Sequence, residues 1–294
     1  MFRIKHLRDL NQLEIKNSEN NLHAKIHLDD GASLQELTLK GHHIIKSLSP
    51  LDYADTYASS ILFPFANRIK DGKYEFEGNS YQFNINEPDN NNALHGMVYN
   101  KRFVFIDEKI TGSGASVKLA YHETQSSTGF PFTYSIYLEY VFTQSTLDLN
   151  VEIRNTDFKI FPFTLGWHPY FISDDLYNSS FLFDSNLKLK LDNRNITEGI
   201  INNENHNNFK MKDQFLDDCF ILKTQNVSFL TPSYSLELRT SEKNSFLQLY
   251  TPPHKNAIAI EPTTGVSDSF NNEIGLKILK PNEGYKISWT LELK

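Results

Sequence analysis

His168 stands in a nine-residue segment, residues 163–171, that is otherwise almost wholly apolar, aromatic or conformationally special. Gly166 permits backbone angles that a side chain forbids, and Pro169 restricts the backbone at its own position and at the residue before it. An imidazole held in this way is either a hydrogen-bonded core residue or a proton-transfer group aimed at a ligand. This segment by itself leaves both interpretations open.

Glu261 follows a run of four apolar residues, 257–260, and precedes Pro262, which we expect to end the strand. A carboxyl group at the end of a buried strand must be hydrogen-bonded or have a raised pKa, because burying a bare charge costs too much. Either state suits a general base, and a solvated strand end is the alternative. Together, His168 and Glu261 would supply the donor and acceptor of acid–base catalysis if the fold brings them to one cleft.

Two further polar groups lie beside apolar or turn-forming residues. Arg68 is surrounded by aromatic and aliphatic neighbours in residues 63–69. It is either half of a structural ion pair or a fork of donors for a polar ligand. His95 follows the polar segment 86–92 and precedes Gly96, where we expect a sharp turn. His95 either orders this loop or belongs to a site.

Several function classes lack their signatures. The sequence has no G-x-S-x-G elbow, no phosphate-binding P-loop and no H-E-x-x-H. His42 and His43 would point to opposite faces of a strand, so no metal site is expected there. Cys219 is the single cysteine, which excludes an intrachain disulfide, and we interpret it as a buried structural thiol. The formal net charge of −7 and the lack of a Lys/Arg cluster argue against a nucleic-acid partner.

The N-terminal residues 1–8 are not followed by an apolar segment, so we expect no secretory signal. Likewise, no run approaches the roughly 18 apolar residues of a membrane helix. We therefore predict a soluble cytoplasmic protein without membrane contact. The length of 294 residues and the absence of a linker-like composition break favour a single domain, residues 1–294.

Period-two alternation of apolar and polar residues dominates the chain and predicts about fifteen strands. We expect short helical turns at 55–60 and 212–219, and a polar surface loop at 193–208. The fold class is all-β, a large antiparallel sandwich or barrel with at most short helical turns. The predicted strands are 23–28, 33–39, 73–77, 81–85, 102–107, 115–123, 133–143, 146–154, 180–191, 227–230, 234–240, 245–250, 257–260 and 285–293.

Six short motifs, taken in order, resemble the aldose 1-epimerase (galactose mutarotase) family. The resemblance covers about residues 20–293 and implies the large antiparallel β-sandwich of that family. The motifs are Asn67-Arg68-Ile69, Leu94-His95-Gly96, His168-Pro169-Tyr170-Phe171, Asp217-Asp218-Cys219-Phe220, Gln248-Leu249-Tyr250-Thr251 and Glu261-Pro262.

The resemblance implies that Glu261 takes the proton of the anomeric hydroxyl and that His168 protonates the ring oxygen. His95 would assist at the ring oxygen or hold the sugar, and an aromatic ring, Trp167 or another, would stack on the sugar. No cofactor and no metal are implied, the partner is a small sugar, and the protein would be a monomer or a homodimer. The side chains expected to bind the sugar are those of Asn67, Arg68, His95, Tyr170, Asp217 and Gln248.

Departures from the family pattern leave the choice between galactose and glucose open. They are residues 97–100, 164–167 and 263–271. Three alternatives remain. The first is a hexose 6-phosphate 1-epimerase, whose phosphate would need converging cations. The second is a non-catalytic carbohydrate-binding module on the same fold. The third is a glycoside hydrolase with Asp217 as the second carboxylate. The cations near Arg68 in the sequence are Lys70, Lys73, Lys101 and Arg102.

Overall fold

Antiparallel sheets make up most of the structure, a computed structural model that describes residues 1–204, 208–254 and 256–294. Among these residues the three large sheets have nine, eight and five strands. In spatial order, the nine-stranded sheet consists of β11 (Val104–Ile110), β12 (Ala115–Glu123), β13 (Tyr134–Phe142), β14 (Thr146–Asn155), β28 (Gly284–Leu293), β24 (Ser235–Thr240), β23 (Asn226–Leu230), β18 (Ser180–Phe183) and β21 (Phe209–Lys210).

The eight-stranded sheet contains the shorter strands that carry most of the polar motifs. In spatial order it consists of β20 (Thr197–Asn202), β19 (Leu187–Leu191), β22 (Asp217–Ile221), β25 (Phe246–Tyr250), β26 (Ala257–Thr263), β16 (Gly166–Trp167) and β6 (Ile61–Leu62), and β17 (Tyr170–Ile172) also pairs with β26.

The first strands of the chain form the five-stranded sheet in sequence order. They are β1 (Phe2–Leu7), β2 (Gln12–Asn17), β3 (His23–His27), β4 (Ser33–Leu39) and β5 (His42–Ile45). Three pairs complete the strands: β7 (Arg68–Lys70) with β10 (Asn92–Leu94), β8 (Lys73–Phe76) with β9 (Asn79–Gln82), and β15 (Phe161–Phe163) with β27 (Lys277–Leu279). The described helices are α1 (Tyr53–Thr56), α2 (Ser269–Asn272) and the 3-10 turns Arg8–Leu10 and Pro88–Asn90.

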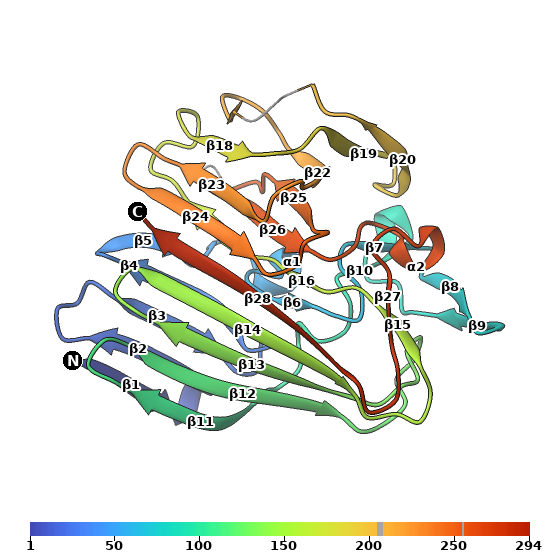
Figure 1. The fold of residues 1–294 in the computed structure, drawn as a ribbon, viewed down its shortest axis with the longest axis horizontal. Helices are drawn as coiled ribbons and strands as arrows, with labels where there is room; N and C mark the ends of the chain where they lie inside the picture. The colour runs from blue at the N-terminus through green and yellow to red at the C-terminus, as the bar shows by residue number, and fades with distance from the viewer. Residues whose placement is uncertain (205–207, 255) are drawn as a thin grey trace.

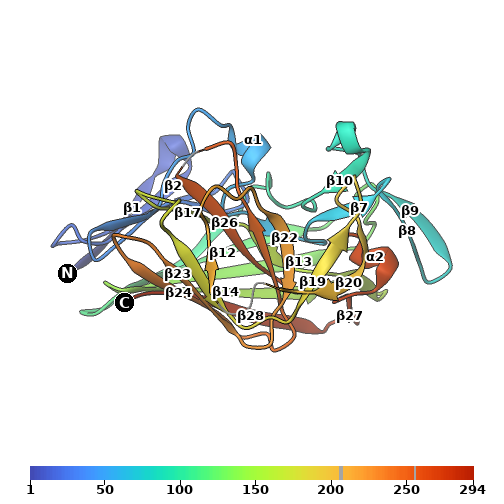
Figure 2. The same cartoon turned by 90° about the horizontal axis from the view of Figure 1, so that it is seen from above.

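The nine-stranded sheet forms one layer, and the strands of the other two large sheets lie against its inner face (Figures 1 and 2). Alternation along β13 buries Ile136 and Leu138 and leaves Glu139 partly exposed on the outer face. Trp289 of β28 stacks on Trp167 of β16 with ring centroids 6.1 Å apart. These contacts join the layers into one core, as a β-sandwich requires, and they confirm the predicted fold class.

Six of the predicted strands form three antiparallel hairpins, each joined by a short turn. Strands 73–77 and 81–85 correspond to β8–β9, strands 102–107 and 115–123 to β11–β12, and strands 133–143 and 146–154 to β13–β14. Strong period-two alternation explains this success, because one face of each hairpin packs on the core or on neighbouring aromatic rings. Cys219 is buried, as predicted, and no described helix has the length and apolar composition needed to span a membrane.

Other local predictions were wrong. The segment predicted as one strand, 180–191, is two strands in different sheets, β18 and β19, because the chain crosses between layers. The helical turn expected at 212–219 is wrong for residues 217–219, which belong to β22 and pair with β25. The surface loop predicted at 193–208 is wrong for residues 197–202, which form β20 and pair with β19. Residues 205–207 of this segment lie outside the described part. Tertiary pairing overrode the local polarity in these segments.

The helical turn expected at 55–60 overlaps only the end of α1, which stops at Tyr57 in the left-handed region. Pro262 does not end its strand, since β26 continues to Thr263 and pairs there with Phe246. Gly166 serves close packing rather than an unusual backbone angle. A Cβ on Gly166 would lie 3.0 Å from the Thr263 side chain.

Gly96 makes the sharp turn expected after His95, with φ of +75°. A Cβ at this position would lie 2.2 Å from the carbonyl oxygen of Phe63. His95 also has a positive φ, 61°, and its N–H donates to the carbonyl of Asn67 at 2.8 Å. This close backbone approach holds the His95 segment against the segment that carries Asn67 and Arg68.

We predict that Gly96→Ala lowers the free energy of unfolding by about 2 kcal/mol or more, because both the positive φ and the backbone clash oppose a side chain. Urea denaturation measures this loss. Gly78→Ala is the matched control, since Gly78 has φ of +71° but an added Cβ would meet no described atom within 4 Å. Equal losses in the two variants would contradict the role of the Phe63 contact.

Candidate active site

One cavity of about 220 Å³ gathers all eight residues that the sequence singled out. They come from positions as distant as Asn67 and Glu261. Five lie on β7, β17, β22, β25 and β26, and His168 lies between β16 and β17. Asn67 directly precedes β7, and His95 directly follows β10. The lining consists of Asp55, Thr56, Tyr57, Asn67, Arg68, Glu87, Leu94, His95, His168, Tyr170, Asp217, Gln248, Tyr250 and Glu261.

Strand register places the central polar side chains on one face of the eight-stranded sheet. Gln248 lies directly opposite Glu261, and Tyr250 lies directly opposite Asp217. Directly paired residues share a face, as do residues two apart along one strand, so these four side chains point the same way. Tyr170 pairs with Ala259, two residues before Glu261, and therefore joins the same face.

His168 is held between β16 and β17 by backbone hydrogen bonds to the segment after α1. Its N–H donates to the Ser60 carbonyl at 3.0 Å, and its carbonyl accepts from the Ser59 N–H at 2.8 Å. Its ring stacks on Tyr170 with centroids 5.0 Å apart and meets the His95 ring edge-on at 4.8 Å. The imidazole is thus fixed by the backbone and by ring packing.

The His168 and Glu261 side chains form a buried pair, with Nε2 and Oε1 3.5 Å apart. Each residue is 3% exposed. Burial raises the pKa of Glu261 well above its ordinary value, and the charge of Asp217 adds to this effect. Burial also lowers the pKa of His168 to about 3. Both shifts disfavour charge, so burial favours a neutral Glu261 carboxyl group beside a neutral His168 imidazole.

His95 is the second buried imidazole of the cavity, 8% exposed. Burial lowers its pKa well below the ordinary value, and His168 and Arg68 add to the effect. Nδ1 of His95 and Nδ1 of His168 have no hydrogen-bond partner among the described residues. Nε2 of His168 faces Glu261, whereas no described side chain fixes the tautomer of His95.

Arg68 and Glu87 form an ion pair inside the cavity. Arg68 Nε and Nη2 lie 2.8–3.0 Å from the Glu87 carboxylate oxygens, and the side chains are 13% and 16% exposed. Burial would raise the pKa of Glu87, but the hydrogen bonds and charge of Arg68 hold it below its ordinary value. The ion-pair interpretation of Arg68 is therefore correct, and this ion pair is part of the cavity wall.

A chain of side-chain amides leads from Arg68 to Asp217. Arg68 Nη1 donates to Asn67 Oδ1 at 3.2 Å, and Asn67 Nδ2 donates to Gln248 Oε1 at 3.4 Å. Gln248 Nε2 then donates to Asp217 Oδ1 at 2.6 Å. The guanidinium can only donate and a carboxylate can only accept, so the two ends set the orientation of both amides.

Sequence reasoning missed several lining residues: Asp55, Thr56, Tyr57, Glu87, Leu94 and Tyr250. Leu94 and Tyr250 stand inside two of the quoted motifs, and Glu87 lies in the polar segment before His95, but nothing in their spacing marked them as site residues. Asp55, Thr56 and Tyr57 reach the cavity through α1, which has no motif of its own.

The aromatic ring expected to stack on the sugar, Trp167 or another, is not Trp167. Trp167 is fully buried and stacks on Trp289 in the core. It precedes His168 in the chain and faces the opposite side of its sheet, as alternation requires. The aromatic side chains that do line the cavity are Tyr57, Tyr170 and Tyr250.

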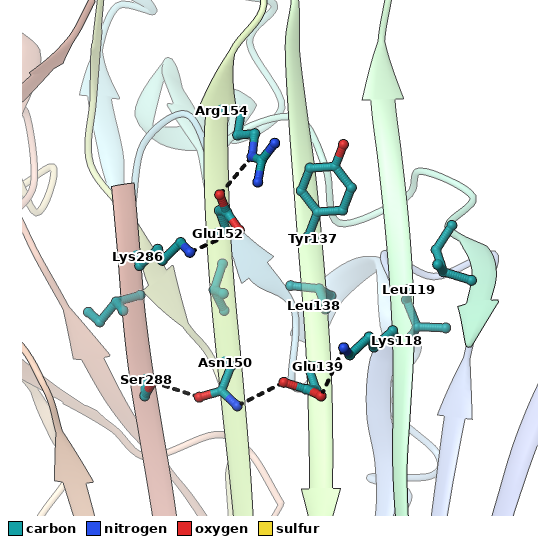
Figure 3. Close-up of a pocket in the computed structure, with 13 residues that line it drawn as sticks. Lys118, Leu119, Tyr137, Leu138, Glu139, Asn150, Glu152, Arg154, Lys286 and Ser288 are labelled. Carbon is teal, nitrogen blue, oxygen red and sulfur yellow. Dashed lines mark hydrogen bonds and ion pairs between the residues drawn. The ribbon is translucent and has the colours of Figure 1, made fainter. Parts of the chain in front are cut away.

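A separate hollow of about 390 Å³ lies on the outer face of β12, β13, β14 and β28 (Figure 3). Its charged side chains form ion pairs with one another. Glu152 lies 2.6 Å from Arg154 and 3.6 Å from Lys286, and Glu139 lies 3.6 Å from Lys118. Cross-strand pairing of this kind is the usual solvent face of an antiparallel sheet.

Comparison with known proteins supports the resemblance read from the motifs. The family profile described as aldose 1-epimerase matches residues 11–292. The uncharacterised protein YihR of Escherichia coli K12 is 25% identical over 275 residues, which are 89% of this chain and 87% of YihR.

Solved structures with the same fold include the following two. A galactose mutarotase-like protein from Clostridium acetobutylicum has a TM-score of 0.85 at 22% identity, with 100% of this chain and 98% of that chain covered. A galactose 1-epimerase from Lactobacillus acidophilus NCFM has a TM-score of 0.81 at 18% identity, with the same coverage of 100% and 98%. Since the family profile spans nearly the whole sequence, the chain belongs to the aldose 1-epimerase family.

Proposed function

We propose that the protein is an aldose 1-epimerase that interconverts the α and β anomers of a neutral aldose, with Glu261 as the base and His168 as the acid. The observation that carries the proposal is the 3.5 Å approach of His168 Nε2 to Glu261 Oε1 in a buried, polar-lined cavity. Membership of the aldose 1-epimerase family supports isomerase chemistry.

In the proposed reaction, the Glu261 carboxylate takes the proton of the anomeric hydroxyl while the His168 imidazolium gives its proton to the ring oxygen. The bond between C1 and the ring oxygen breaks, and C1 becomes the aldehyde carbon. Rotation about C1–C2 presents the other carbonyl face to the ring hydroxyl. Both proton transfers then run in reverse as the ring closes. The reaction involves no redox change and no covalent enzyme intermediate.

This direction of transfer requires the pair's proton to lie on His168 when the sugar is bound. Burial disfavours that ion-pair tautomer, but opposite charges 3.5 Å apart attract each other strongly at low dielectric. Hydroxyl groups of the sugar also donate hydrogen bonds to carboxylates and stabilise the charged form of Glu261. The two groups therefore titrate as one coupled pair.

The charges around the cavity favour a neutral sugar over a phosphorylated one. Asp55, Glu87, Asp217 and Glu261 contribute carboxyl groups, and Arg68 is the permanent cation among the described lining residues. Arg68 is already paired with Glu87. A phosphate would need two or three converging cations, and the candidate cations Lys70, Lys73, Lys101 and Arg102 do not line this cavity.

The remaining alternatives have less support. A carbohydrate-binding module has no use for a buried donor–acceptor pair, since binding a sugar needs hydrogen bonds but no proton transfer. A glycoside hydrolase would pair Glu261 with a second carboxylate. Asp217 instead accepts hydrogen bonds from Gln248 and Asn195, and Glu261 pairs with His168 at 3.5 Å.

We predict that His168→Ala and Glu261→Gln each reduce the catalysed rate of anomer exchange by at least about 10²-fold, because each removes one proton-transfer group. Exchange NMR or polarimetry on α-glucose and α-galactose measures the rate at low buffer concentration. His42→Ala, which changes an exposed histidine on β5, is the matched control and should retain activity. Unchanged rates in the two site variants contradict the roles assigned to them. Sugar binding without acceleration by the wild type supports the binding module instead.

The pH profile of kcat/KM should be bell-shaped. Below the lower limb both groups are protonated and Glu261 cannot accept a proton, and above the upper limb the pair has no proton for the ring oxygen. The raised pKa of Glu261 moves the upper limb above the ordinary carboxyl range. The His168 pKa of about 3 moves the lower limb into acid. Rates corrected for the spontaneous reaction that rise steadily with pH would contradict the shared-proton pair.

We predict that glucose 6-phosphate has a kcat/KM at least about tenfold below that of glucose, because its phosphate meets a net negative cavity. Glu87→Gln should reduce the preference for glucose over glucose 6-phosphate. The substitution removes one negative charge from the cavity and breaks the ion pair that occupies Arg68. Glu75→Gln, at an exposed position on β8, is the control and should leave the preference unchanged. A preference for the phosphorylated sugar in the wild type would establish the hexose 6-phosphate alternative.

A further inference from the structure

The turn between β19 and β20, residues 192–196, reaches from the edge of the eight-stranded sheet to the segment before β10. Figures 1 and 2 both show β19 and β20 beside the part of the chain that carries β7 and β10. The turn is closed by a hydrogen bond from the Asp192 N–H to the Ile196 carbonyl at 2.9 Å. Its central residues, Arg194 and Asn195, do not line the cavity. Their side chains donate hydrogen bonds to the segment before β10 and to Asp217.

Arg194 fastens the turn to the segment that carries Glu87. Its Nε donates to the Asn90 carbonyl at 2.7 Å, and its Nη2 donates to Asn92 Oδ1 at 3.0 Å. Asn92 is fully buried, and its Nδ2 donates to Glu87 Oε2 at 2.9 Å. Because the guanidinium can only donate, it fixes the Asn92 amide in the orientation that serves Glu87. Asp71 also pairs with Arg194, at 2.8 Å.

Asn195 orients the Asp217 carboxylate in a similar way. Its Nδ2 donates to Asp217 Oδ2 at 3.0 Å, while Gln248 Nε2 donates to Asp217 Oδ1 at 2.6 Å. Asn195 itself has a positive φ, 60°, and its carbonyl accepts from the Ser267 hydroxyl at 2.7 Å. Each oxygen of the Asp217 carboxylate therefore has one fixed donor and keeps its remaining acceptor capacity.

These hydrogen bonds, together with the backbone between Arg194 and Asn195, close into a ring beside the cavity. From Arg68 the ring runs through Glu87 and Asn92 to the turn. From the turn it returns through Asp217 and Gln248 to Asn67, whose side-chain amide accepts a hydrogen bond from Arg68. Two of its members, Glu87 and Asp217, are acceptor carboxylates that line the cavity.

We propose that Arg194 and Asn195 are positioning residues for sugar binding, which hold the Glu87 and Asp217 carboxylates in the orientation that receives sugar hydroxyls. The inference rests on the proposed function of the same cavity and deepens it. A carboxylate that is already oriented pays less entropy when a hydroxyl binds, so the turn acts on KM more than on kcat. The reacting pair, His168 and Glu261, is not part of the ring.

The test uses Asn195→Ala in the full-length protein, with anomer exchange followed over a range of glucose or galactose concentrations. We expect KM to rise about tenfold, the effect of losing a hydrogen bond to a charged group, and kcat to change less than about twofold. Asn193→Ala, at the exposed neighbouring position of the turn, is the matched control and should leave both parameters unchanged. A KM within twofold of the wild type overturns the role of Asn195.

The pH dependence of KM distinguishes a positioning role of Asn195 from a general loss of structure in the Asn195→Ala variant. Burial raises the pKa of Asp217, Arg68 lowers it, and the nearby acids Asp218 and Glu87 raise it again. Removing the Asn195 donor takes away a hydrogen bond that favours the carboxylate, so KM should begin to deteriorate at a higher pH during acidification. An altered KM with an unshifted pH dependence overturns the assignment to Asp217. In an Asp217→Asn background, Asn195→Ala should have no further effect, and full additivity also overturns it.

Arg194 is tested by Arg194→Lys and Arg194→Ala. Lysine keeps the charge but not the planar fork that bonds Asn90 and Asn92 together, so KM should rise in both variants and more in alanine. Normal KM in both overturns the role of Arg194. Failure of the wild type to accelerate any aldose overturns the proposed function, and the same variants then test the inference through their Kd for the sugar by calorimetry.

Discussion

The burial of a carboxyl group beside an imidazole is the constraint on which the rest of the site depends. Glu261 and His168 are each 3% exposed, and an isolated charge at either position would cost several kcal/mol. One shared proton removes most of that cost, because the pair is neutral overall whichever group carries it. The same shared proton is what anomer exchange requires, since one oxygen of the sugar must lose a proton while the other gains one. Stability and chemistry thus place the same demand on this pair.

The polar side chains around this pair are stabilised by hydrogen bonds and ion pairs with one another. Arg68 compensates Glu87, and its remaining donors orient Asn67 and, through that amide, Gln248. Carboxylates at the ends of such chains keep their charge at lower cost than unpartnered ones, because each accepts hydrogen bonds in a fixed geometry. The cavity can therefore hold several acids close to Glu261 without forcing them all to become neutral. This arrangement also offers acceptors to hydroxyl groups while opposing anionic ligands.

The sheet supplies the precision that loops would lack. Gln248, Glu261 and Asp217 lie on adjacent strands whose register fixes which side chains are neighbours. A shift of one residue in any of these strands would turn its polar side chain to the other face. The core between the layers resists such a shift, since it would bring polar residues into contact with rings such as Trp167 and Trp289. The imidazoles come from shorter segments. Backbone hydrogen bonds to Ser59 and Ser60 hold His168, and one to Asn67 holds His95.

The sequence by itself determined the fold class and eight of the residues that gather at the cavity. Period-two alternation is a local signal, and so the hairpins β8–β9, β11–β12 and β13–β14 were predictable from it. Short motifs around His95, His168 and Glu261 stood out because histidine and glutamate are unusual among apolar and turn-forming neighbours. Which of them meet was not predictable, since the 3.5 Å between His168 and Glu261 arises from pairing across β17 and β26. Only the tertiary structure decided that Arg68 is paired with Glu87, that Trp167 faces the core, and that the polar segment after Asp192 reaches Asp217. The physical reason is that side-chain partners are set by strand register and by packing between layers, which depend on residues far apart in the chain.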